Sequence, residues 1–260
     1  METIYYVLLG LMGLCVGSFL NVVIYRLPRE KTILLDRSRC PNCSKQLAWY
    51  HNIPLLSFIA LRGKCAFCAQ KISPRYPLIE AINAATYLFF FHQYGPTLLF
   101  FTVALLASAL LVIFFIDLDF QIIPDSITIP GMILGMAVSF LPDGIGIIQS
   151  AIGLLVGGGA LYCIALLGDW LFKKESMGGG DIKMAGMLGS FLGWQKVLFV
   201  FIASASIGLV VSLVIMAFSA KMRKERLIPF GPFLALAAMV AILYGDRIVG
   251  FYISTILRIP

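Results

Sequence analysis

Long apolar runs, interrupted by short polar segments, dominate the chain. Residues 98–116 and 197–218 contain no charged residue at all. A helix needs ~20 such residues to cross a bilayer, whereas the strands of a membrane barrel alternate over ~10 residues. The pattern therefore predicts an all-α, polytopic membrane helix bundle. About eight helices are expected, of which the fourth and sixth are short for a crossing: 4–25, 77–94, 97–116, 125–141, 145–168, 182–194, 196–219 and 228–245.

Composition excludes a water-soluble globule. Of the 260 residues, 60% are hydrophobic and 13% are charged, and the mean hydropathy is +0.94. Soluble domains average ~45–50% apolar and ~25% charged residues.

The basic residues predict the orientation. Ten of the 20 Lys and Arg lie in 26–75. If the loop 26–76 is cytoplasmic, 17 basic residues fall on that side and three on the other, and the N-terminus lies outside. We therefore attribute most of the net charge of +7 to the orientation of the protein in the membrane. The basic loop would also attract anionic membrane lipid, and the charge requires no nucleic-acid partner. The other basic residues of the cytoplasmic side are Lys173, Lys174, Lys183, Lys221, Arg223, Lys224 and Arg226.

Four of the six cysteines form two CxxC pairs inside this loop, with 21 residues between the pairs: Cys40, Cys43, Cys65 and Cys68. Two such pairs form the tetrahedral four-sulfur cage that Zn²⁺ accepts, and a closed cage makes the metal structural. The alternative is idle or redox-active thiols. Cys15 and Cys163 lie in apolar runs, and we expect them to be small buried hydrophobic residues.

Acidic residues are few, and some lie at the ends of apolar runs. Asp117, Asp119 and Asp125 follow the run that ends at 116, and Asp181 follows three glycines. An ionisable group at membrane depth indicates function. For Asp125 we favour a helix N-cap, and for Asp119 a side chain that points to water.

Asp117 and Asp181 are the stronger candidates. Glycines at 178–180 allow a partner backbone or an extended peptide to approach Asp181, although they also fit a flexible turn. Both acids end up on the cytoplasmic side, so they can meet. Two close carboxyls share a proton, so that one activates water and the other polarises a carbonyl. This is aspartic peptidase chemistry, but the residues alone do not separate Asp117 from Asp119.

Motifs along nearly the whole chain resemble the type IV prepilin peptidases, which are leader peptidase/N-methyltransferases of the GxGD-type membrane aspartic peptidases. The resemblance implies catalytic roles for Asp117 and Asp181, supported by Gly178, Gly180 and Lys183. Lys183 would change the proton affinity of the two aspartates or contact the substrate. Alternatively, it is only one of the basic residues that fix the orientation in the membrane. The motifs are 17–28, both CxxC pairs, 52–54, 62–65, 72–77, Glu80, 117–125 and 178–183.

The resemblance also implies two reactions in the bacterial inner membrane. The basic leader of prepilins and pseudopilins is cleaved at the cytoplasmic face, and the new N-terminal residue, usually Phe, is methylated with S-adenosylmethionine. It divides the chain into a first helix at 1–25, a methyltransferase-associated loop at 26–76 and a peptidase domain at 77–260.

The site for S-adenosylmethionine is not identified by the sequence. No glycine-rich Rossmann turn follows a strand. Trp49, Tyr50 and Tyr76 offer aromatic faces to a sulfonium cation, but we expect these rings to pack the small zinc-ordered core.

Three alternatives remain. The chain could be a peptidase without methyl transfer, a proton-coupled transporter, or a zinc-ordered scaffold of a secretion assembly. The oligomeric state is left open.

Overall fold

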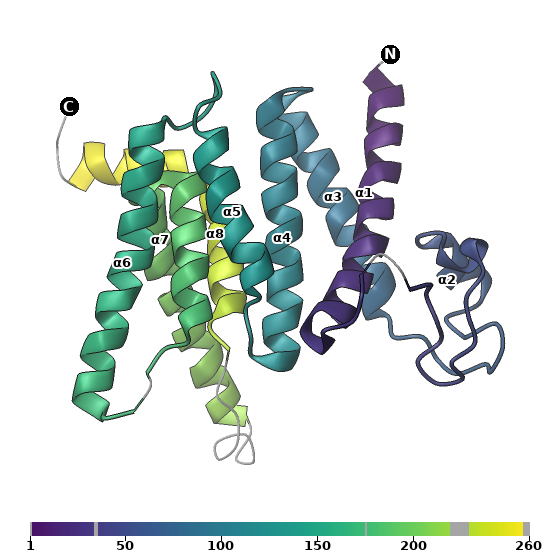
Figure 1. Ribbon diagram of the computed structural model, residues 1–260. Helices are drawn as coiled ribbons and strands as arrows, with labels where there is room; N and C mark the ends of the chain where they lie inside the picture. Colours follow the sequence, from purple (N-terminus) through teal and green to yellow (C-terminus); the bar gives the residue numbers. More distant parts are fainter. Residues whose placement is uncertain (1, 34–35, 175, 219–228, 257–260) are drawn as a thin grey trace. The chain divides into compact units, whose positions relative to one another are not determined.

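The computed structural model describes residues 2–33, 36–174, 176–218 and 229–256, and the regular elements of these residues are all helical (Figure 1). The elements are α1 (Glu2–Arg26), η1 (Leu27–Arg29), η2 (Trp49–Asn52), α2 (Leu56–Ala60), α3 (Arg75–Tyr94), α4 (Leu98–Phe120), α5 (Asp125–Val138), α6 (Ile147–Phe172), α7 (Gly179–Phe218), α8 (Gly231–Phe251) and η3 (Tyr252–Ile256).

The predicted all-α fold is confirmed, and each expected apolar helix has a counterpart. The expected sixth and seventh helices together form α7, which Gly193 divides by its φ of 80° and ψ of 169°. That region of backbone conformation is essentially open to glycine alone. The break therefore comes one residue before the expected sixth helix ends.

Within the described residues, five helices are long and apolar enough to cross a membrane: α1, α4, α6, α7 and α8. Many apolar side chains of α6 point away from the protein, including Leu155, which is 69% exposed, and Leu167, which is 66% exposed. Such surfaces are unfavourable in water but natural against lipid. The chain is a multi-pass membrane protein.

Three predicted helix ends were too early. The α4 helix continues to Phe120, α6 to Phe172 and α8 to Phe251, whereas we expected ends at 116, 168 and 245. Apolar runs mark the membrane-buried stretch, but the backbone hydrogen-bond ladder does not stop where polar residues begin. As a result, Asp117 lies in the last turn of α4 instead of following it.

The chain forms two compact units, residues 1–112 and 113–260. In the first unit α1 packs antiparallel to α3, and Gly13 and Gly17 allow the two backbones to touch. The Asn83 side chain donates a hydrogen bond to the Gly13 carbonyl (2.8 Å), and the Ser108 hydroxyl donates to Asn83 Oδ1 (2.9 Å). These buried bonds tie α4 to the helix pair.

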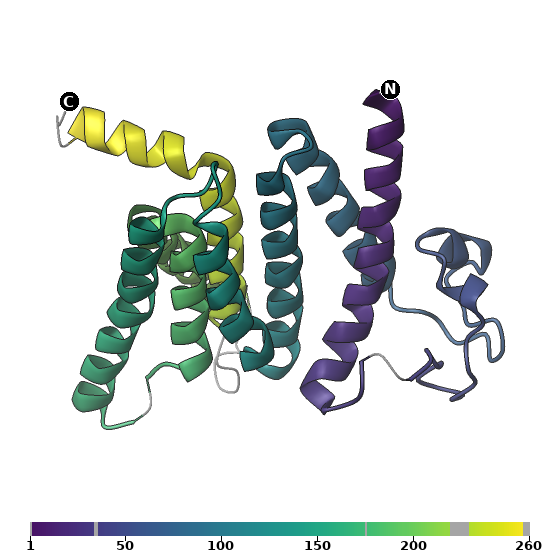
Figure 2. The same ribbon diagram turned by 45° about the horizontal axis from the view of Figure 1, so that its top comes forward.

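The second unit is built on α7. Its first segment runs antiparallel to α6, with Gly153 against Gly189, and Figure 2 shows the two helices side by side. Its second segment runs antiparallel to α8, where Lys196 pairs with Asp246 (2.7 Å). This order brings the end of α4 and the beginnings of α5, α7 and α8 to one end of the unit.

The glycine contact between α6 and α7 predicts a stability difference. A methyl group on Gly153 would collide with the Gly189 carbonyl, whereas one on Gly159 of the same helix meets no described atom within 4 Å. We expect Gly153→Ala to destabilise the protein by ~1–3 kcal/mol and Gly159→Ala to be neutral or stabilising by up to ~1 kcal/mol. Thermal unfolding in detergent measures both, and equal midpoints for the two variants would contradict the packing.

Candidate functional site

Asp117 is buried at the end of α4, with 5% of its surface exposed. Its Oδ2 accepts a hydrogen bond from the Gly231 N–H (3.0 Å), the first backbone amide of α8. Helix N-termini favour negative charge because their first N–H groups lack partners within the helix. A Cβ at Gly231 would lie 2.5 Å from Asp117 Oδ2, so only glycine permits this approach. The α8 N-terminus therefore holds the carboxyl in place.

Gly231 was missed in the sequence. Its signal was the pair Gly231-Pro232 at the start of an apolar run, since proline in the first turn marks a helix N-terminus. Nothing in that pair pointed to Asp117, which lies 114 residues earlier.

Asp181 lies in the first turn of α7 and is partly buried. Its Oδ1 is buried and has no hydrogen-bond partner within the described part of the chain. Asp117 and Asp181 are close enough to repel each other electrostatically when both are ionised. The structure thus brings the two predicted acids together, and one oxygen of Asp181 remains available to a further group.

Ile123, in the linker between α4 and α5, lies between the beginnings of α7 and α8. A Cβ at Gly180 would be 2.8 Å from Ile123 Cβ, and one at Gly231 would be 3.0 Å from Ile123 Cδ1. Gly180 is therefore needed for the packing of α7 against this linker. Gly178 is exposed, and a Cβ there would be 3.4 Å from Asp181 Oδ2, so its small size leaves the carboxyl accessible.

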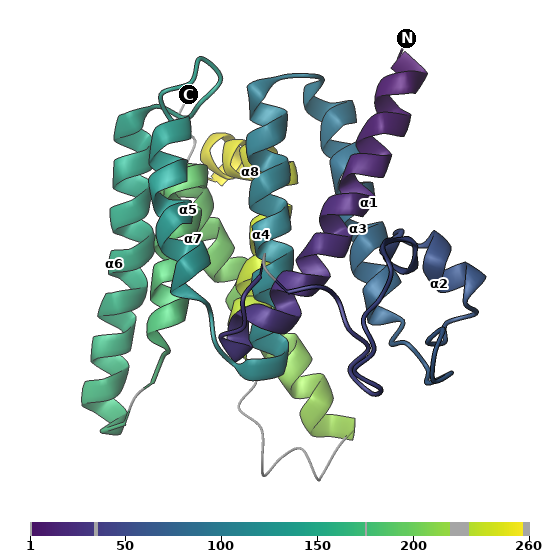
Figure 3. The ribbon, with the colours of Figure 1, turned by 45° about the vertical axis from the view of Figure 1, so that its right-hand side comes forward.

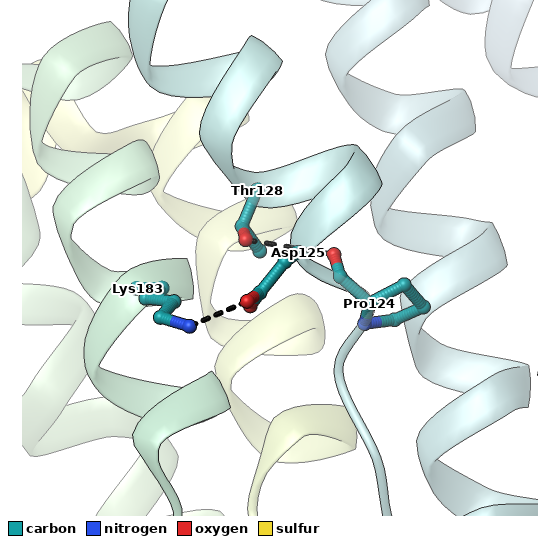
Figure 4. Close-up of polar contacts among 4 residues, drawn as sticks. All are labelled: Pro124, Asp125, Thr128 and Lys183. Carbon is teal, nitrogen blue, oxygen red and sulfur yellow. Dashed lines mark hydrogen bonds and ion pairs between the residues drawn. The ribbon is translucent and has the colours of Figure 1, made fainter.

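The other acids of this region point elsewhere. Asp119 is exposed on α4. Our N-cap interpretation of Asp125 is wrong, because Pro124 occupies the cap position and Asp125 is the first residue of α5. Figure 4 shows the reason: the Asp125 carboxylate accepts from Lys183 Nζ (2.6 Å), while the Thr128 hydroxyl reaches back to the Pro124 carbonyl (3.5 Å).

Lys183 therefore pairs with Asp125 and joins the first turn of α7 to the first turn of α5. Both side chains are about half exposed, at 42% and 53%. Exposed ion pairs contribute only ~0.2–1 kcal/mol, so this contact aligns the two helices more than it stabilises them. Any support that Lys183 gives to Asp181 is indirect in this arrangement.

A second tether, also missed in the sequence, fixes the approach to the glycines. The Ser176 N–H donates to Asp169 Oδ1 (2.7 Å), and the Ser176 hydroxyl donates to the Ala165 carbonyl (3.1 Å). The segment before Gly178 is thereby held against the end of α6. The sequence showed only a polar loop there.

The four paired cysteines meet in the first unit. All four sulfurs lie within 4.8 Å of one another, and Cys40 Sγ is 3.9 Å from Cys68 Sγ. A tetrahedral site with Zn–S bonds of ~2.3 Å has S···S edges of ~3.8 Å. The donor set and its spacing therefore fit zinc.

The two CxxC pairs have the same local structure. In the first pair the Cys40 N–H donates to the Lys45 carbonyl (3.0 Å), and in the second the Cys65 N–H donates to the Gln70 carbonyl (2.8 Å). Each bond spans five residues. The residue after each second cysteine, Ser44 or Ala69, has a φ near 55°. These tight turns aim both sulfurs of a pair to one side.

The protonation of the thiols also suits a metal. The Phe67 N–H lowers the pKa of Cys65 to about 6, and the Gln70 N–H lowers the pKa of Cys68. The Lys45 N–H acts in the same direction on Cys43, but desolvation and the thiols of Cys40 and Cys68 outweigh it and raise the pKa of Cys43 to about 11. Four adjacent thiolates need a cation among them.

Two expectations about aromatic and cysteine side chains were wrong. Trp49, Tyr50 and Tyr76 do not pack a zinc-ordered core, since they are 78%, 53% and 38% exposed; a fold this small has too little interior for large rings. Cys15 and Cys163 are exposed on α1 and α6 instead of buried, because apolar faces of membrane helices also turn outward.

Comparisons with known proteins agree with this geometry. Residues 11–94 match the bacterial peptidase A24 N-terminal domain, and residues 104–213 match the type IV leader peptidase family. A prepilin leader peptidase/N-methyltransferase of Pseudomonas putida is 34% identical over 95% of this chain and 94% of its own length. The chain belongs to the type IV leader peptidase family.

Other family members bear the same name. The protein of Stutzerimonas stutzeri is 37% identical over 94% of this chain and 92% of its own length. The protein of Myxococcus xanthus is 42% identical over 81% of this chain, and the match spans 63% of that protein. No solved structure matches the chain at a significant level.

The four-sulfur cluster predicts bound zinc with a defined pH dependence. Cys40→Ser should lose most of the metal measured by elemental analysis, whereas Cys163→Ser on α6 should keep it. Protons compete with zinc for the thiolates, so zinc should stay bound to the wild type at neutral pH and leave when the solution is made strongly acidic. Equal metal content in the two serine variants would contradict the assignment.

Proposed function

We propose that this protein cleaves the leader peptide from type IV prepilins and pseudopilins and then N-methylates the new N-terminal residue, as the names of its relatives describe. The observation that carries the proposal is the pairing of Asp117 and Asp181. Helix ends 64 residues apart in sequence put two carboxyls within electrostatic reach at one end of the second unit.

The proposed location is the bacterial inner membrane, with the N-terminus outside and the loop 26–76 in the cytoplasm. Within the second unit, residues 121–124, 173–174 and 176–178 of the linkers lie at the same end as the two acids, which fits one cytoplasmic side. Lys173, Lys174 and Lys183 belong to this end. The basic cluster at 221–226, and Arg258 of the opposite side, lie outside the described residues.

The proposed division of labour assigns hydrolysis to 77–260 and methyl transfer to the loop 26–76 with the first helix. The zinc-binding geometry lies in that loop, and the two acids lie beyond it. The four thiolates would hold Zn²⁺, which would order the loop without an open coordination position for chemistry.

In the proposed hydrolysis the two acids share one proton. The ionised carboxyl removes a proton from water, the water oxygen bonds to the scissile carbonyl carbon, and the protonated carboxyl donates to the carbonyl oxygen. The C–N bond of the resulting diol then breaks, the amine nitrogen takes a proton from the pair, and one diol hydroxyl returns a proton to the pair as the product carboxyl forms. Because the Gly231 N–H favours a negative charge on Asp117, we assign the base to Asp117 and the shared proton to Asp181.

Two features of the site support cleavage of an extended peptide. The glycines at 178 and 179 have no side chains and are exposed beside Asp181. Among the residues that the structure describes, the buried Oδ1 of Asp181 lacks a partner, and a buried polar oxygen normally has one. A substrate carbonyl approaching along the glycines would supply it.

S-adenosylmethionine is the proposed methyl donor, because a sulfonium methyl group transfers to an amine and leaves a thioether. The N-terminal amine must be unprotonated to accept the methyl group and loses a proton afterwards. The rings of Trp49 and Tyr50 contact each other edge to face, with centroids 5.7 Å apart. This arrangement is not that of an aromatic cage around a cation.

The assigned pair predicts a sharp difference between neighbouring acids. Asp117→Asn and Asp181→Asn should each lower cleavage by at least ~10²–10⁴-fold, because each removes a group that moves a proton. Asp119→Asn, two residues along α4 and exposed, is the matched control and should keep most activity. Detergent-purified protein with a prepilin is assayed by gel shift. Normal cleavage by Asp181→Asn, or equal loss in Asp119→Asn, would contradict the assignment.

The mass of the product tests the two reactions separately. With S-adenosylmethionine present, the product should lack the leader and carry one additional methyl group on its N-terminus. A product without the methyl group would mean a peptidase alone. An uncleaved precursor would reject the proposal and leave the transporter and scaffold alternatives.

A further inference from the structure

The short helix α2 lies at the depth of the membrane-spanning part of α1. Gly17 is in backbone contact with Glu80 of α3, and the Leu55 N–H, at the start of α2, donates to Glu80 Oε2 (2.9 Å). Gly17 precedes the end of α1 at Arg26 by nine residues, or ~13 Å of helix. Figure 3 accordingly shows α2 beside the C-terminal half of α1 instead of beyond its end.

The direction of the Glu80 side chain refines this depth. Side chains tilt toward the N-terminus of their helix, which for α3 is the end nearest to Arg26, and a glutamate spans ~5 Å. The start of α2 therefore lies ~8–13 Å short of the end of α1. The headgroup layer is ~5–8 Å thick on each side of a bilayer. With Arg26 placed at the outer edge of this layer, α2 reaches the boundary between headgroups and acyl chains.

The side chains at this depth are unusually apolar for a loop. Five exposed residues form what we call the interfacial patch: Trp49, Tyr50, Ile53, Leu56 and Ile59. Leu56 and Ile59 are three residues apart on α2, on one face, and are 66% and 69% exposed. Trp and Tyr beside aliphatic residues are typical of the membrane–water interface.

The positive charge of the segment around the interfacial patch favours binding to anionic lipids. Residues 37–79 contain seven basic residues and no acidic residue. Four thiolates with one Zn²⁺ would subtract two charges and leave the segment positive. Arg62 and Lys64 directly follow α2 and are exposed, so they are placed to meet anionic headgroups while the patch enters the acyl boundary.

We propose that the zinc-binding loop is a membrane-embedded interfacial element, in which the interfacial patch inserts into the cytoplasmic leaflet and its basic residues bind anionic lipid. The residues of this patch include neither Asp117 nor Asp181, and the inference does not depend on the proposed catalysis. The loop is then held by the bilayer as well as by Glu80, at the level where a membrane-anchored substrate leaves the lipid.

Trp49 is a built-in reporter for this proposal. Full-length protein with Trp170→Phe and Trp194→Phe has only Trp49 and is placed in bilayers of phosphatidylcholine with or without phosphatidylglycerol. We expect blue-shifted Trp49 emission and a loss of intensity with lipids brominated near the headgroup end of the chains. Lipids brominated near the chain terminus should quench less, and phosphatidylglycerol should increase the quenching.

Variants test the role of α2 directly. In the same background, Leu56→Glu with Ile59→Glu should shift the emission to the red and reduce quenching by the shallow bromines. Leu56→Met with Ile59→Leu keeps both positions apolar and of similar volume, and should leave the quenching unchanged. Zinc content, measured in each sample, verifies that the loop is intact.

Two results would overturn the proposal. One is emission typical of an indole in water, with no quenching by either brominated lipid at any lipid composition. The other is a Trp49 signal that changes only when S-adenosylmethionine or a prepilin is added, which would assign the patch to that ligand.

Discussion

The hydrogen bond from the Gly231 N–H to the buried Asp117 carboxyl is the contact on which the candidate active site depends. A carboxyl buried at the end of a membrane helix is costly unless a partner compensates the lost water. The N-terminus of α8 provides that partner, and glycine at 231 lets the backbone approach the carboxyl. The same end of the unit receives Asp181 through the close packing of Gly180 against Ile123. One constraint thus places α4, α7 and α8 together.

Close backbone contacts and short polar ties help to position the helices around this site. Gly153 and Gly189 bring α6 against α7, and Ser176 and Lys183 tie the beginning of α7 to α6 and α5. Lipid offers little hydrophobic force between helices, so small residues and polar ties decide how they pack. The acids therefore sit on a rigid support, whereas the glycines beside Asp181 remain accessible.

The sequence predicted features that depend on local pattern. Apolar runs predicted the helices, and paired CxxC spacing predicted the sulfur cluster. It did not predict features that depend on long-range geometry: Gly231 beside Asp117, Lys183 on Asp125, or the bond from Glu80 to the start of α2. The difference between Asp117 and Asp119 is of this second kind, because only the packing of α4 turns one inward and leaves the other exposed. The exposed aromatic residues of the loop were misjudged because the sequence does not show how little interior the loop has.

The central claim is that Asp117, and not Asp119, faces Asp181 in the protein at rest. A short bifunctional thiol reagent measures this directly, in protein that lacks Cys15 and Cys163 and carries a protease site in the linker 139–146. After cleavage, Cys at 181 is then the only thiol of the C-terminal fragment. With Asp117→Cys and Asp181→Cys the fragments should remain joined, and with Asp119→Cys and Asp181→Cys they should separate. Separation of the first pair, or equal joining of both, would contradict the account.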